Sequence, residues 1–307
     1  MVTDLQAARS RWGVGNLDGT AAKDSPEVTA WQERSLNSAA VGELGDYTLP
    51  MLQEWGWNTF DVQWEATLFG DRPVSVLKLR DDIDMAVVTD SLEQAYLVDG
   101  PPERPHYRFD RTTGASIMPF LEATVLPEHK LIVTGGAPEE VLAVFDGNAP
   151  SVASLPEEKP WAELTMTPEV MQVRTGGDAC TDPVAGTLGQ RASADQRAQL
   201  EQKLLDLQQL ARPVTIVHAL QDESTAVILA GYSDPQDAAA DLHARRTLLT
   251  EGQSTQAERP YTDLLPTIDI AAEGKDLVYS VSGTGTARLT LQMSQTQDDP
   301  WAYCGTG

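Results

Sequence analysis

The alternation of apolar and polar positions predicts a β-hairpin followed by a helix in the first half of the chain. Residues 62–79 form two strand-like runs joined by a turn at Gly70. Residues 85–95 place apolar side chains at helical spacing, and Asp81 and Asp82 end the strand and are the expected caps of that helix. The apolar stripe of this helix consists of Met85, Val88, Leu92 and Ala95.

Further along, residues 123–136 predict two strands that turn at Pro127, and residues 137–147 predict a short helix that Gly147 closes. The proline-rich stretch 99–115 is expected to be a loop.

Two helices are expected before the first hairpin. Ser25 is the candidate N-cap of a helix over residues 25–40, because Pro26 follows it at the first helical position. Residues 46–60 predict a short helix that breaks at Gly56.

The second half repeats the order of strands and helices. Residues 213–232 predict a strand pair, and Asp234 then starts a helix whose apolar face carries Ala238, Leu242 and Leu249. Residues 267–282 predict another strand pair. Two other elements are expected here: a helix over 193–213, capped by Ser193 and Gln196, and a final strand over 287–294.

The spacing between the halves is nearly constant. Asp81 and Asp234 lie 153 positions apart, and Leu131 and Leu277 lie 146 apart. Either a duplication or a chance match produces such a pattern, and we favour duplication. The sequence therefore predicts an α+β protein with two pseudo-repeated units of antiparallel strands and a helix packed on one face. The expected divisions are an N-terminal helical or irregular segment, 1–45, a first unit, 46–150, and a second unit, 151–307.

The chain is acidic, with a formal net charge of −24 that residues 1–150 and 151–307 share almost evenly. A field of this sign repels phosphate backbones, so nucleic acid is not an expected partner. No apolar run in the sequence is long enough to span a membrane.

Cys180 and Cys304 are expected to form a disulfide bond. Exported proteins commonly pair their few cysteines, and a covalent tie would hold the C-terminal segment in place. Two buried free thiols are the alternative. The opening "MVTDLQAARSRW" has no apolar segment typical of a signal peptide, so either the protein is cytosolic or a removed export signal preceded Met1.

The short motifs do not assemble into a known catalytic, cofactor or metal site. The aspartates of "RDDIDM" lack the pattern of a calcium-binding loop. The glycines of "GVGNLDG" and "SGTGTA" are interpreted as turns, the second because a strand is expected after it. "SVLK" lies in a strand, where its Ser and Lys point to opposite faces. The four histidines are scattered, and we predict no catalytic residue, cofactor or metal ligand.

Three tryptophans cluster in "EWGWNTFDVQW", namely Trp55, Trp57 and Trp64. An exposed aromatic cluster stacks on sugars or docks a partner. Packing in the core or between subdomains is the commoner role. These residues are the candidates for partner binding.

The stretches "GWNTFDVQWEATLFGDRPVSVLKLRDDIDMAVVTDSLEQA" and "ATVLPEHKLIVTGGAPEEVLAVFDG", with the late Cys304, resemble exported, lipid-anchored proteins of unknown function from actinobacteria. The resemblance covers about residues 60–300. It implies an extracytoplasmic location at the cell envelope, with a lipid anchor outside this chain, and it supplies no activity and no site residues.

The functional expectation is a non-catalytic binding or accessory module at the cell envelope, with an unknown protein or small-molecule partner. The alternative is a hydrolase-type enzyme with its site between the two halves, and a third option is a cation-binding protein.

Overall fold

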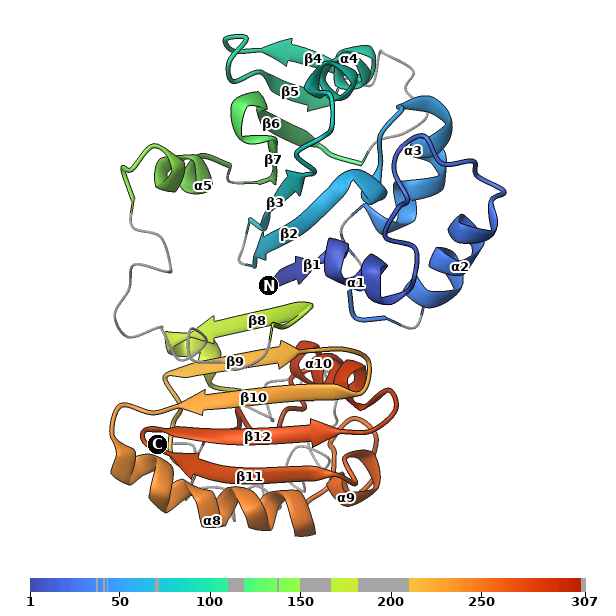
Figure 1. The fold of residues 1–307 in the computed structure, drawn as a ribbon. Coiled ribbons are helices and arrows are strands. Elements are labelled where there is room, and N and C mark those ends of the chain that lie inside the picture. The colour runs from blue at the N-terminus through green and yellow to red at the C-terminus, as the bar shows by residue number, and fades with distance from the viewer. Residues whose placement is uncertain are drawn as a thin grey trace, which may run out of the picture. The chain divides into compact units, whose positions relative to one another are not determined.

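In the computed structural model the chain divides into two compact units, Met1–Leu155 and Pro156–Gly307. The first is drawn from blue to green in Figure 1 and the second from yellow-green to red. The structure describes all residues except 37, 41, 43, 70, 71, 110–118, 137, 150–166, 182–209 and 305–307. The helix predicted over 193–213 lies almost entirely outside the described residues.

The first unit is an antiparallel sheet with helices. Its described strands lie in the order β1-β2-β3-β7-β6-β5-β4. They are β1 (Val2–Asp4), β2 (Val62–Leu68), β3 (Val74–Leu79), β4 (Tyr96–Asp99), β5 (His106–Phe109), β6 (Glu122–Leu126) and β7 (Leu131–Gly135). The helices are α1 (Leu5–Arg11), α2 (Pro26–Ser35), α3 (Thr48–Glu54), α4 (Met85–Ala95) and α5 (Pro138–Phe145), with short 3-10 turns η1 (Gly45–Tyr47), η2 (Thr59–Asp61) and η3 (Pro127–His129).

The second unit has the described strand order β11-β12-β10-β9-β8, also antiparallel throughout. The strands are β8 (Val170–Thr175), β9 (Thr215–Leu220), β10 (Thr225–Gly231), β11 (Ile268–Glu273) and β12 (Asp276–Ser282). The helices are α8 (Pro235–Glu251), α9 (Tyr261–Leu264) and α10 (Thr286–Gln295), with a 3-10 turn η7 (Gly176–Ala179).

The two units share an order of strands. The series β1-β2-β3-β7-β6 matches β8-β9-β10-β12-β11, and the helices α4 and α8 occupy equivalent places in the chain, after the hairpins β2–β3 and β9–β10. The first unit adds β4 and β5 at the far edge. The α+β class with antiparallel strands is therefore confirmed, and the origin of the units by duplication stays a prediction.

The sheet of the first unit has an apolar cluster on each face because successive side chains of a strand point in opposite directions. Leu77 and Leu79 of β3 pack with Val88 and Leu92 of α4. Val74 and its neighbours on the opposite face pack against Val141 and Leu142 of α5. The hydrophobic periodicity predicted both helices correctly, including the Gly147 that follows α5 with a positive φ of 71°.

The predicted caps of α4, Asp81 and Asp82, were wrong by three and two residues. Asp84 is the N-cap, and its side chain accepts a hydrogen bond from the backbone N–H of Ala86. Asp81 instead accepts from Lys78, and Asp82 pairs with Arg80. Ser25 and Asp234 cap α2 and α8 as predicted.

Two other expectations are corrected. Part of the predicted loop 99–115 forms the short strand β5, which begins directly after Pro105, and β4 extends to Asp99. The predicted final strand is the helix α10, because its Thr290 and Ser294 side chains have hydrogen-bond partners in the interior and face inward with Leu291. The glycines of "SGTGTA" consequently open a helix and not a strand, and Gly285 is its N-cap.

The predicted disulfide bond between Cys180 and Cys304 is present, with 5.7 Å between the Cα atoms. It ties the C-terminal segment to the residue after η7. Backbone hydrogen bonds between Thr181 and residues Ala302 and Cys304 run beside it. Among the described residues, no helix is both long enough and apolar enough to cross a membrane.

Candidate functional site

The tryptophans singled out from the sequence do not form an exposed cluster. Trp55 and Trp57 are buried in the core on the α4 face of the sheet, where Trp57 Nε1 donates to Ser91 Oγ at 2.8 Å. Trp64 is partly buried and packs with the cluster on the opposite face. The sheet thus separates Trp64 from the other two, of which Trp55 is 7% exposed and Trp57 is completely buried.

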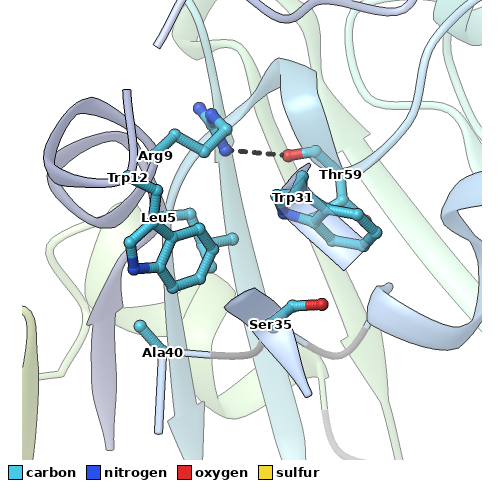
Figure 2. Close-up of a pocket in the computed structure, with 8 residues that line it drawn as sticks. Leu5, Arg9, Trp12, Trp31, Ser35, Ala40 and Thr59 are labelled. Carbon is cyan, nitrogen blue, oxygen red and sulfur yellow. Dashed lines mark hydrogen bonds between the residues drawn. The ribbon is translucent and has the colours of Figure 1, made fainter. Parts of the chain in front are cut away.

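A cavity lies elsewhere in the first unit, where α1, α2 and η2 meet (Figure 2). It is a small space that opens to solvent, and its interior has room for about one water molecule. Its lining residues are Leu5, Arg9, Trp12, Trp31, Ser35, Ala40, Gly42 and Thr59.

Arg9 reaches this cavity because α1 turns its apolar side toward the protein interior. Asp4 caps the helix by accepting from the N–H of Ala7. Leu5 and Arg9 are one helical turn apart and therefore lie on the same face, which is buried. The Arg9 side chain extends along this face, and the residue is only 2% exposed.

The guanidinium of Arg9 donates to two backbone carbonyls through two of its five N–H groups. Nη1 donates to the carbonyl of Thr59 at 3.1 Å, the bond marked in Figure 2, and Nη2 donates to that of Val62 at 2.9 Å. Nε is buried and has no hydrogen-bond partner. A buried N–H left unpaired costs about 1–3 kcal/mol, so a group that accepts from it would stabilise the site.

The charge of Arg9 also lacks a close counter-charge. Burial lowers its pKa to about 10 and the nearby Arg80 acts in the same direction, while the charges of Asp61 and Asp4 oppose the shift. Arg9 therefore remains a cation at neutral pH. In the described part of the chain no carboxylate forms an ion pair with it. A desolvated cation at the wall of a cavity is a suitable place for an anionic group.

The carbonyl that Arg9 contacts is held in place by a rigid polar turn. Asp61 accepts from the N–H groups of Asn58 and Gly19, at 3.0 and 3.2 Å, and its burial raises its pKa. Thr59 Oγ1 donates to the carbonyl of Leu44 at 3.0 Å. These bonds fix η2, so the geometry of the Arg9 guanidinium is fixed with it.

Two indoles supply the apolar walls of the cavity. Trp12 follows α1, and Trp31 lies in α2, where its ring meets Phe60 edge-on at 5.1 Å between centroids. The Arg11 guanidinium lies 5.8 Å from the Trp12 ring. Both indoles are largely buried, with Trp12 5% and Trp31 7% exposed, so each presents only a small part of its ring to the cavity, and Arg9 supplies the charged group of the lining.

The local sequence pattern did not predict a role for Arg9, Trp12 or Trp31. Because residues 1–45 are polar overall, no buried face was expected there. The available signal was the spacing of Leu5, Ala8 and Arg9, which places a charged residue on the inner face of a short helix.

A second polar group lies buried in the second unit around His218. His218 Nε2 lies 2.8 Å from Thr290 Oγ1, and Nδ1 lies 3.4 Å from Ser294 Oγ. Asp299 accepts from Ser294 at 3.3 Å and from Arg174. In a serine protease triad the aspartate orients the histidine, whereas here it contacts the serine and the arginine. This arrangement is a buried hydrogen-bond network and does not have the connectivity of a catalytic triad.

The other polar motifs have structural partners. In "RDDIDM", Asp84 caps α4, and Asp81 and Asp82 form ion pairs with Lys78 and Arg80. Within the described ranges, no group of three or more His, Cys, Asp or Glu side chains is placed to hold a metal ion.

Comparison with known protein families, with curated proteins and with solved structures finds no match for this chain.

Proposed function

We propose that this protein is a non-catalytic binding module that works outside the cytoplasm, and that the cavity beside Arg9 is its ligand contact. The observation that carries the proposal is the buried Arg9 guanidinium, with its unpaired Nε–H, between the walls formed by Trp12 and Trp31. Small-molecule sites commonly combine apolar walls with a few convergent polar groups, and this cavity has that composition.

The location outside the cytoplasm is supported by the disulfide bond between Cys180 and Cys304. Such bonds persist in oxidising compartments and are rare in the cytosol of most organisms. The negative charge is spread over both halves of the chain, so it does not itself mark a binding surface, and the proposed contact is a local site. The envelope location and the anchor implied by the sequence resemblance belong to this proposal.

The test is a ligand screen by thermal shift, followed by calorimetry. Sugars, lipids, organic acids and cell-wall fragments are added to the wild-type chain, and a ligand of this site raises the melting temperature progressively with its concentration. Ser35→Leu places a larger side chain at the rim of the cavity. Thr29→Leu, at an exposed position of the same helix, is the matched control.

We expect ligands that stabilise the wild type and the Thr29→Leu variant to lose their effect on the Ser35→Leu variant. Equal stabilisation of all three proteins would show that the ligand binds elsewhere. A screen with no stabilising compound would count against a small-molecule module.

A further inference from the structure

We infer that the outer edge of β4 binds an extended segment of another protein as an added strand, and that this segment is apolar in its middle and basic at its ends. The described strand order of the first unit ends at β4, which Figure 1 shows beside α4. The edge includes no residue of the Arg9 cavity, so the inference does not depend on the proposed function.

The backbone of β4 has hydrogen-bonding groups that face away from the sheet. In an antiparallel sheet the N–H and C=O groups of successive residues point to opposite sides. The N–H of Phe109 donates to the carbonyl of Leu121, beside β6, so the backbone of Arg108 faces β4 and bonds to its register partner Leu97. The next residue, Val98, therefore directs its N–H and C=O outward. In the described part of the chain no other strand pairs with this side of β4.

The side chains of the edge are apolar on both faces of the sheet. Leu97 is 52% exposed and Val98 is 47% exposed. Val98 lies on the α4 face with its register partner Tyr107, and Leu97 lies on the opposite face. An added strand would cover both side chains and pair with the backbone groups of Val98, which is how extended peptides bind to sheet edges.

The edge strand of the second unit, β11, shows the protection that β4 lacks. Asp269 and Glu273 of β11 are exposed, and Arg246 Nη2 donates to the carbonyl of Ile270 at 2.8 Å. Charged side chains and covered backbone groups are the usual protection of an edge against strand addition. β4 contains no Lys and no Pro, and its single charged residue, Asp99, is the last of the strand. Its middle is therefore open to pairing.

The charges around β4 favour a basic partner. Asp99 ends the strand, and Arg108 lies 4.0 Å from it. Burial raises the pKa of Tyr107, in the adjacent strand β5, to about 12, and the charges of Glu93 and Asp90 on α4 act in the same direction. Both of these carboxylates are exposed. With a net charge of −24 the chain attracts a cationic segment and repels a second copy of itself.

The test titrates two peptides, acetyl-KTVLVTK-amide and acetyl-ETVLVTE-amide, into the ¹⁵N-labelled full chain at pH 7 and low salt. We expect the Lys peptide to bind about tenfold or more tightly than the Glu peptide, with an advantage that decreases as salt is added. The NMR signal of the Val98 amide should shift, and its hydrogen exchange should slow, because that N–H gains an acceptor.

Two variants at one position separate backbone pairing from side-chain contact. Val98→Pro removes the outward N–H and leaves the bonds between Leu97 and β5, since proline is tolerated at an edge where the N–H faces solvent. It is expected to weaken binding of the Lys peptide by about tenfold. Val98→Thr keeps the N–H and the branched side chain, and is the matched control. Its affinity is expected to stay within about threefold of the wild type.

The outcomes that would overturn the inference are distinct. Equal binding of the two peptides would overturn the basic partner, and binding that Val98→Pro leaves unchanged would overturn strand addition. A wild-type dimer in sedimentation that Val98→Pro dissociates would assign the edge to a second copy. Absence of any change at the Val98 amide at millimolar Lys peptide would overturn the site, and this measurement on the wild type decides even where Val98→Pro does not fold.

Discussion

Arg245 Nε donates to Asp241 Oδ2 at 2.8 Å, one turn earlier in α8, and both side chains are completely buried. The same guanidinium donates to the carbonyls of Pro300 and Tyr303, at 2.6 and 2.7 Å. Asp241 also accepts from the hydroxyl of Tyr232 at 2.5 Å. One ion pair thus connects α8 to the C-terminal segment and to the residue that follows β10.

Replacing Arg245 with Met is expected to lower the free energy of unfolding by about 3–5 kcal/mol, because Asp241 becomes a buried charge without its partner. Urea unfolding at pH 7 measures the change. Arg246→Met, at the neighbouring position, is the control; it removes one hydrogen bond to the carbonyl of Ile270 and no ion pair, and is expected to cost about 1 kcal/mol. The double variant Asp241→Leu/Arg245→Met should recover part of the loss, and a double variant no more stable than Arg245→Met would contradict the explanation.

Stability is expected to fall in mild acid because of His218. Burial, with a smaller effect of Arg174, lowers the pKa of His218 to about 3. Between pH 6.5 and pH 3 the unfolded chain therefore binds a proton at this residue and the folded chain does not. The free energy of unfolding then decreases by about 1.4 kcal/mol for each pH unit below about 6.5.

The measurement is the urea midpoint of the wild type and of His218→Gln between pH 7 and pH 5. Burial raises the pKa of the neighbouring Asp299, which favours the folded state as pH falls and opposes the histidine. Since His218→Gln removes the histidine contribution and keeps Asp299, the wild type should lose more stability on acidification than the variant. His243→Gln, at an exposed position of α8, is the matched control. Parallel profiles for all three proteins would contradict the prediction.

Loss of the disulfide bond is expected to destabilise the second unit. The bond joins residues 124 positions apart, and a closed loop of this length corresponds to about 5 kcal/mol in the chain-entropy description, with typical measured values of about 2–4 kcal/mol. The double variant Cys180→Ser/Cys304→Ser should therefore unfold at lower urea. Dithiothreitol should bring the wild type to the same midpoint and leave the variant unchanged. A wild type insensitive to reduction would indicate that the bond contributes little.

The corrected cap of α4 provides a paired test. Asp84→Ala removes the acceptor for the N–H of Ala86 and is expected to cost about 1 kcal/mol. Asp82→Ala removes an exposed ion pair with Arg80, which is expected to cost less than about 0.5 kcal/mol. Thermal unfolding of both variants measures the difference. A larger loss of stability for Asp82→Ala than for Asp84→Ala would indicate that Asp82, as predicted from the sequence, is the cap.

Local patterns predicted the hairpins and most helices because their signals lie within a few residues of one another. The short apolar runs of β9 and β10 and the Asp-Pro start of α8 needed no distant contact to be recognised. The same reasoning failed for residues 287–294. Leu289, Leu291 and Met293 alternate as in a strand, yet Thr290 and Ser294 face the interior of a helix.

The hydrophobic pattern of the sequence could not predict which polar residues lie on buried faces. Asp241 and Arg245 occupy the inner face of α8, where only apolar residues were expected, because they neutralise each other. At the candidate site, Arg9 is likewise a charged residue on the inner face of a helix. Its contacts with Thr59 and Val62 cross 50 and 53 positions of sequence.

By itself, the sequence determined the α+β class, the order of most elements and the pairing of Cys180 with Cys304. These follow from periodicity, from capping and turn residues, and from the presence of only two cysteines. The tertiary structure alone decided that Trp55 and Trp57 belong to the core and that Arg9 borders a cavity. The physical reason is that a polar or aromatic side chain is buried where distant parts of the chain form hydrogen bonds with it or pack around it. The short-range spacing of residues in the sequence does not indicate which distant residues those are.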